Sequence, residues 1–133
     1  LLSHLEMTLE VGGKKYQLST HQFPGVAPTP GYRFLESFTQ DPLPRWVFRL
    51  PTGTVERTVT IPRGSRSVVV ATTWSGKEPA RLSLRPLLPM RAAGELTREH
   101  GAMLQKVTVR RGEVEVQPVP QLPPLVFRHG GVF

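Results

Sequence analysis

Four carboxylates are the side chains whose type and setting could serve acid–base chemistry on a glycosidic bond: Glu36, Asp41, Glu95 and Glu99. Hydrolysis of such a bond needs two carboxyl groups roughly 5–10 Å apart, one on each side of the bond that breaks. Asp41 precedes a proline, which is typical of a turn, and Glu95 and Glu99 share a face only if their segment is helical. The spacing assigns no pair, so roles in turns and ion pairs are favoured over catalysis.

Other catalytic and metal-binding chemistry lacks the residues that it needs. The chain has no cysteine, which excludes a thiolate nucleophile, a thiolate zinc site and a disulfide. The serines in "RGSR" and "WSG" are typical of hairpin turns, and there is no Gly-x-Ser-x-Gly motif. The histidines are scattered along the chain without the spacing of metal ligands. We therefore expect no catalytic residue, no metal ion and no cofactor.

Aromatic side chains gather in the stretch "GYRFLESFTQDPLPRW", which surrounds the chain's only aspartate. If residues 32–40 are extended, Phe34 and Phe38 lie on one side of the strand, and we expect both in the core. Polar groups in aromatic surroundings need partners when they are buried, and Trp and Tyr rings also stack on sugars. The candidate ligand or domain-interface residues of this stretch are Tyr32, Arg33, Glu36 and Trp46.

Period-two alternation of apolar and polar residues predicts the strands that must position these side chains. Residues 5–11 alternate, Gly12-Gly13 suits a two-residue hairpin turn, and "SVVVATTW" is a β-branched run typical of a strand. A second hairpin is predicted about Arg111-Gly112. Because strands recur with turn residues between them, we expect an all-β fold, an antiparallel β-sandwich. The one helical candidate, "GELTREHGAML", is one or two short turns at most.

Charge and hydropathy limit the class of protein further. The chain has 133 residues, about one domain, and a net charge of +7. The basic excess is spread over both halves, which favours a solvated arginine-rich surface over a nucleic-acid footprint. No apolar run approaches the ~20 residues that span a bilayer. The absence of cysteine fits the cytoplasm, so we expect a cytoplasmic protein with no nucleic-acid or membrane partner.

Four sequence motifs carry a resemblance to a known family. They are "GYRFLESF", "DPLPRW", "LRPLL" and "LPPLVF", and they occur in this order. The chain resembles the N-terminal domain of bacterial and archaeal glycogen debranching enzymes of the amylo-alpha-1,6-glucosidase type, over nearly its whole length. The resemblance implies a β-sandwich of the supersandwich type that precedes a barrel of paired helices. In such proteins, carboxylates of the barrel hydrolyse alpha-1,6 branch linkages.

The chain also departs from the pattern of this family. Members begin upstream with a Gly-rich segment and continue after "HGGVF" with aromatic-rich strands, so we expect residues 1–133 to form a single β-sandwich domain that is an incomplete fragment. After Arg91, members have Asp, an aromatic residue and often His, where this chain has Ala92, Ala93 and Gly94. Arg91 and Arg98 flank this altered loop and are further ligand or interface candidates, because the planar fork of Arg suits carboxylates and sugar hydroxyls.

The sequence therefore predicts a non-catalytic module that packs on the catalytic barrel of the same protein and contacts an alpha-glucan such as glycogen. Unpaired strand edges of such a fragment predict self-association. One alternative is a free-standing carbohydrate-binding module, in which the same aromatic residues stack on glucan. A basic oligonucleotide-binding barrel and a glycoside hydrolase that acts alone also remain open.

Overall fold

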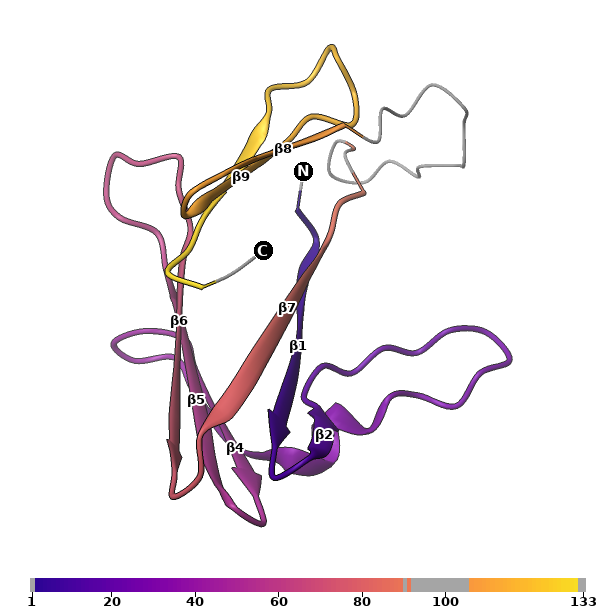
Figure 1. The fold of residues 1–133 in the computed structure, drawn as a ribbon, viewed down its shortest axis with the longest axis vertical. Helices are drawn as coiled ribbons and strands as arrows, with labels where there is room; N and C mark the ends of the chain where they lie inside the picture. The colour runs from indigo at the N-terminus through magenta and orange to yellow at the C-terminus, as the bar shows by residue number, and fades with distance from the viewer. Residues whose placement is uncertain (1, 90, 92–105, 132–133) are drawn as a thin grey trace. The chain divides into compact units, whose positions relative to one another are not determined.

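The computed structural model describes residues 2–89, 91 and 106–131, and Figure 1 shows their ribbon. The chain divides into two compact units, one formed by Glu6–Arg85 and the other by Leu1–Leu5 with Pro86–Phe133. The predicted short helical turns at residues 94–104 lie outside the described residues, as do Ala92, Ala93 and Gly94. The prediction of a single domain over residues 1–133 stays a prediction.

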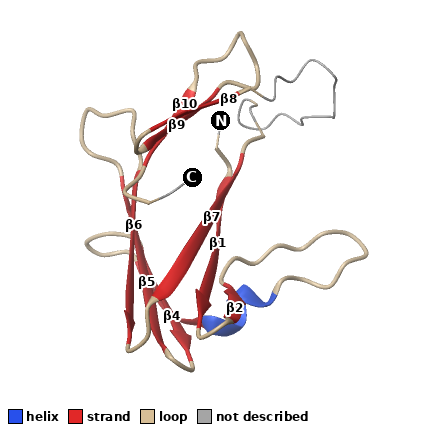
Figure 2. Cartoon of the chain, viewed as in Figure 1, coloured by secondary structure: helices blue, strands red, loops and turns tan. Residues whose placement is uncertain are grey.

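The described residues are almost all strands and loops (Figure 2). The elements are β1 (His4–Val11), β2 (Lys14–Gln17), the 3-10 helix η1 (Pro30–Phe34), β3 (Leu35–Thr39), β4 (Arg45–Leu50), β5 (Gly53–Thr60), β6 (Val69–Gly76), β7 (Ala80–Leu87), β8 (Val107–Arg110), β9 (Glu113–Val116) and β10 (Leu125–Arg128). They form three antiparallel sheets, with strand orders β2-β1-β7, β3-β4-β5-β6 and β10-β9-β8. The predicted all-β class is confirmed.

The unit Glu6–Arg85 is a sandwich of two sheets around one hydrophobic core. Alternate residues of β1 point inward from the sheet β2-β1-β7, and alternate residues of β4 and β5 point inward from the four-stranded sheet. The buried side chains of this core are Met7, Leu9, Val11, Leu18, Phe48, Leu50 and Val55. Full burial of each such side chain stabilises the fold by roughly 1.5–3 kcal/mol relative to exposure, so this cluster holds the two sheets together.

The predicted hairpin turns are confirmed. Gly12 and Gly13 have φ angles of 56° and 72° and join β1 to β2, with Val11 opposite Lys14. Two positive φ angles match the right-handed twist of the paired strands, which explains why glycine occupies both positions. Gly112, with φ 71°, makes the turn between β8 and β9. These turns fix the register of both hairpins.

The sheet β10-β9-β8 of the other unit has one apolar face and one charged face. Val109, Val114 and Phe127 lie opposite one another across its strands, and Val114 is buried. On the other face Glu113 lies between two arginines, 3.2 Å from Arg110 Nη1 and 3.1 Å from Arg128 Nε. Strand alternation produces this separation of apolar from charged side chains.

The stretch of residues 32–40 is not one extended strand, which corrects the prediction. Residues 30–34 form η1, because Pro30 fixes φ at its start and Gly31 lies so close to the backbone of Leu18 and Ser19 that a Cβ would come within 2.5 Å. Only β3 is extended, and it is an exposed strand at the edge of its sheet. Phe34 packs against the core as predicted. Phe38 does not, because it belongs to the exposed edge strand.

Candidate functional site

A β-bulge in β3 decides which side chains of the aromatic stretch share a face. Leu35 lies opposite Phe48 and Ser37 opposite Val47, so Glu36 is one extra residue on β3. Such a bulge shifts the alternation of side chains by one position. Leu35 and Phe38 therefore share the face of Phe48 and Trp46, although an unbroken strand would have placed them on opposite faces.

Large apolar side chains are exposed along this edge of the sheet. We call the β3 edge surface the set of Tyr32, Arg33, Leu35, Phe38, Leu43 and Trp46, of which Trp46 is partly buried against the core. The exposed fractions are 52% for Tyr32, 41% for Leu35, 46% for Phe38 and 41% for Leu43. Phe38 and Trp46 form a tilted pair with ring centroids 4.9 Å apart. Exposed apolar residues scattered singly need no explanation, but several of them in and around one edge strand are typical of an interaction site.

Arg33 supplies a cation beside the exposed aromatic ring of Tyr32. Its guanidinium carbon lies 5.8 Å from the centroid of the Tyr32 ring, and its Nε donates a hydrogen bond of 3.4 Å to the Tyr32 hydroxyl. η1 is anchored beneath them, because the Phe34 ring meets the Tyr16 ring edge-on at 5.7 Å. The pair of Tyr32 and Arg33 is thus presented to solvent on a fixed turn.

Glu36 points to the opposite face, where it is bound by an arginine. Arg49 donates from Nε to Oε1 at 3.1 Å and from Nη2 to Oε2 at 3.0 Å, and its Nη1 donates to the Thr54 hydroxyl at 2.8 Å. This two-pronged geometry fixes the orientation of both side chains. Sequence analysis missed this partner, because Arg49 is on another strand. Glu36 therefore links β3 to β4, and both of its carboxylate oxygens already accept hydrogen bonds from Arg49.

A second cation, Arg57, lies on the same face as the aromatic pair. It stands opposite Trp46 across the β4–β5 ladder and opposite Thr72 across the β5–β6 ladder. Burial lowers the pKa of the Arg57 guanidinium. The sequence could have identified Arg57, because this arginine occupies an inward position between Val55 and Val59 in an otherwise apolar series.

Of the remaining predicted candidates, the structure describes only Arg91. Arg91 is exposed and belongs to the unit that contains Pro86–Phe133. Arg98 lies outside the described residues. Among the predicted site residues of the unit Glu6–Arg85, Arg33 contacts Tyr32 and Trp46 contacts Phe38, while Glu36 points to the other face.

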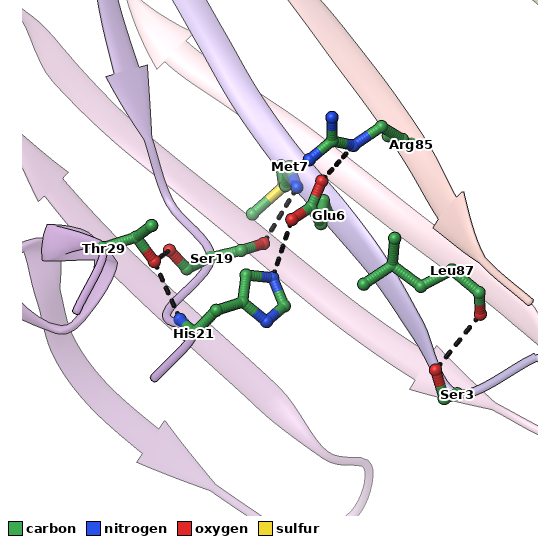
Figure 3. Close-up of polar contacts among 8 residues, drawn as sticks. All are labelled: Ser3, Glu6, Met7, Ser19, His21, Thr29, Arg85 and Leu87. Atoms are coloured by element: carbon green, nitrogen blue, oxygen red, sulfur yellow. Dashed lines mark hydrogen bonds and ion pairs between the residues drawn. The ribbon is translucent and has the colours of Figure 1, made fainter. Parts of the chain in front are cut away.

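A buried carboxylate forms a second polar site that sequence analysis missed. Glu6 is 8% exposed, and its Oε1 lies 2.9 Å from His21 Nε2, while Arg85 Nε donates a hydrogen bond to Oε2 (Figure 3). The Glu6 carboxylate raises the pKa of Arg85, chiefly by accepting this hydrogen bond. Alternation in β1 places Glu6 on the outward face of its sheet, so the sequence gave no sign that it is buried.

The loop after β2 covers Glu6, and hydrogen bonds hold it at both of its ends (Figure 3). Met7 N donates to the Ser19 hydroxyl at 2.9 Å, and His21 N donates to the Thr29 hydroxyl at 2.8 Å. The Thr29 hydroxyl donates in turn to the Ser19 carbonyl at 2.9 Å. Beyond these bonds the loop carries an exposed Phe23, which stacks on His21 with centroids 5.9 Å apart. These hydrogen bonds therefore hold both ends of a loop whose middle carries an exposed apolar side chain.

Neither site has the composition of a metal centre. Among residues 2–89, 91 and 106–131, no three His, Asp or Glu side chains are grouped as metal ligands would be. None of the helical segments in this described part of the chain has the length and hydropathy needed to cross a membrane.

Comparison with known proteins gives one match. A family model described as the N-terminal part of glycogen debranching enzyme matches residues 1–132. No curated protein and no solved structure matches the chain. The predicted resemblance is confirmed by the family match.

Proposed function

Because the chain belongs to the family of glycogen debranching enzyme N-terminal domains, we propose that it is a non-catalytic module that packs on the catalytic domain of its parent protein. In this role it shapes the approach of an alpha-glucan to an active site elsewhere in the parent. The resemblance described above implies that the catalytic domain is a barrel of paired helices. The cytoplasm is the proposed location, since a chain without cysteine suits a reducing compartment.

The β3 edge surface is the observation that carries this proposal. Tyr, Trp and Arg are the residues that most often dominate the energy of protein interfaces, and this surface contains one of each, Tyr32, Trp46 and Arg33. Leu35 and Phe38 add exposed apolar area beside them. Burial of such area stabilises a complex by about 25 cal/mol per Å², before the cost of association is subtracted.

The setting of the described carboxylates supports a non-catalytic role. Glu36, Glu56 and Glu113 each accept hydrogen bonds from arginines, and Glu6 accepts one from Arg85. A glycosidase needs one carboxyl group that stays protonated until it donates its proton. Arg45 acts against this requirement at Glu56, because its hydrogen bond lowers the pKa of that carboxyl.

Hydrogen exchange tests the docking proposal directly. We would compare amide exchange of residues 32–46 in the isolated chain with exchange in the full-length product of its gene. Docking of the β3 edge surface is expected to slow exchange in this segment, while β5 serves as a control because it pairs with a neighbour on each side. Equal exchange at residues 32–46 in both proteins would contradict docking through this surface.

The exposed aromatic pair favours a second candidate, a free-standing carbohydrate-binding module. Phe38 and Trp46 form a tilted ring pair that a pyranose ring could contact through its apolar side, and Phe38 is half exposed. Affinity electrophoresis in glycogen distinguishes the two roles. Retardation of the isolated chain that is lost in Trp46→Ala and kept in Thr39→Ala would support glucan binding. No retardation would leave docking as the role of the surface.

A further inference from the structure

The four strands that end the two sheets of the unit Glu6–Arg85 differ in how their edges are protected. An edge strand presents unpaired N–H and C=O groups, and proteins block such edges with charge, proline, bulges or short length. β2 has four residues and two lysines, β7 contains Arg81, Arg85 and Pro86, and β3 carries the bulge at Glu36. These three edges each carry at least one protective feature.

β6 carries none of these features. It pairs with β5 in an unbroken register from Gly53 opposite Gly76 to Thr60 opposite Val69, and its other side is an edge of the sheet. The run "SVVVATTWSG", residues 67–76, contains no charge and no proline. Its outward-facing residues, among them Val69, are exposed. A long, regular, uncharged and β-branched edge is the kind that accepts another strand.

We propose that β6 is an interaction edge that pairs antiparallel with β6 of a second copy of this chain. The pairing joins two four-stranded sheets into one continuous sheet, with β6 beside β6 at its centre. It adds main-chain hydrogen bonds without a change in the fold of either copy, as in other cases of strand addition. The interface is isologous, because the same strand is used by both copies.

The register of this pairing follows from symmetry and from the sequence of β6. A two-fold axis perpendicular to the sheet keeps each inward face inward, and an axis at Thr72 sets Thr72 opposite its own copy. Ala71 then lies opposite Thr73, and Val70 opposite Trp74. Threonine pairs and pairs of β-branched with aromatic residues are favourable cross-strand neighbours. No charge faces a like charge anywhere along the strand, which is why a second copy is a suitable occupant.

The net charge of the chain predicts how the strength of this dimer depends on salt. Each copy has a net charge of +7, so two copies repel each other at a distance, while the strand interface itself is uncharged. Salt screens the repulsion, with a Debye length of about 10 Å at 0.1 M. The dimer is therefore expected to become stronger as salt is raised, opposite to an interface built from ion pairs.

Sedimentation velocity of the full chain over about a hundredfold range of concentration tests the proposal. The wild-type chain is expected to pass from monomer to dimer, and Thr73→Lys is expected to weaken the dimer at least about tenfold, since lysine is a common blocker of strand edges. Ser37→Lys, on the exposed edge strand β3, is the matched control and is expected to leave the dimer unchanged. Circular dichroism confirms that each variant is folded.

A mixing experiment tests the register. In the pairing centred on Thr72, residue 73 of one copy meets residue 71 of the other. A Thr73→Lys chain mixed with an Ala71→Glu chain is therefore expected to form a heterodimer that is stronger than the dimer of either variant alone. A wild-type chain that stays monomeric at every concentration overturns the proposal. So does a dimer that survives Thr73→Lys, or one that Ser37→Lys disrupts equally. A heterodimer that fails to form overturns the register.

Discussion

The two sheets of the unit Glu6–Arg85 carry arginine–glutamate pairs on their outward faces, yet the two faces set these pairs in different surroundings. On β1 the Glu6 carboxylate is buried under the loop after β2 and contacts both His21 and Arg85. On the four-stranded sheet the pairs of Glu36 with Arg49 and of Glu56 with Arg45 remain exposed to water. The same kind of ion pair is thus buried on one sheet and exposed on the other.

The difference lies in what covers the carboxylate. A buried charge must keep its partners, because their loss leaves it without compensation for lost hydration. An exposed pair can exchange each partner for water, and its net contribution is small. We therefore expect Glu6 to fasten a loop to the sandwich, whereas the exposed pairs of the four-stranded sheet mainly order side chains across an otherwise polar face. Four predictions test this comparison.

Removal of the buried carboxylate is expected to have the largest effect. Glu6→Gln keeps the shape of the side chain but loses its charge, and it should lower the free energy of unfolding by about 2 kcal/mol, the range for hydrogen bonds to charged groups. Urea denaturation measures the change. Glu10→Gln, on the same face of the same strand, is the control and should stay within about 0.5 kcal/mol of the wild type. Equal losses in both variants would contradict a special role for Glu6.

The fastening of the loop is expected to show a smaller effect. Thr29→Val preserves volume but removes the hydroxyl that bonds His21 N and the Ser19 carbonyl. The expected loss is about 1 kcal/mol, together with faster proteolysis within residues 22–28, because loop tips are preferred cleavage sites once released. Thr39→Val on the exposed edge strand is the control. Unchanged proteolysis would show that these bonds do not hold the loop.

Much of the fold was predictable because alternation and turn residues act over short distances. The hairpins at Gly12-Gly13 and Gly112, the strands β1 and β6, and the all-β class all follow from local pattern. The burial of Glu6 does not, since it depends on a loop that folds back over the strand. Local alternation assigns such a residue to the exposed face whatever lies above it.

The sequence identified the aromatic stretch but not its geometry, and the roles of its residues stay a prediction. Two of its ring contacts, Arg33 with Tyr32 and Trp46 with Phe38, join residues of that stretch. The bulge at Glu36, however, reverses the faces of the residues on its two sides, and no residue type marks it in the sequence. Glu36 was therefore expected among the ring-bearing residues, whereas it turns away from them to meet Arg49.

This exposed pair offers the third prediction. A double-mutant cycle of Glu36→Ala and Arg49→Ala should give a coupling free energy of about 0.5 kcal/mol, typical of exposed pairs. The coupling should fall as salt is raised, because screening is strong at the surface. Chemical denaturation of the four proteins at low and high salt supplies the measurement. A coupling as large as the effect of Glu6→Gln would remove the distinction between the two sheets.

The smallest expected effect is the pH dependence of the other exposed pair. Arg45 donates a hydrogen bond to Glu56 and lowers the pKa of that carboxyl from its ordinary value of 4.5. A carboxyl whose pKa is lower in the folded state contributes stability above its unfolded pKa, and this contribution is lost as the pH falls through the folded value. The difference in stability between the wild type and Glu56→Gln should therefore be constant near neutral pH and shrink below pH 4.5.

Urea denaturation of both proteins at a series of pH values measures this difference, and the buried carboxylate provides the contrast. Because Glu56 is exposed, high salt should reduce the difference at neutral pH, whereas the loss caused by Glu6→Gln should persist in the same salt. If salt weakens both effects alike, burial beneath the loop does not shield Glu6. The two faces would then differ in geometry alone, and the hydrogen bonds of Ser19 and Thr29 would remain as the anchors of the loop after β2.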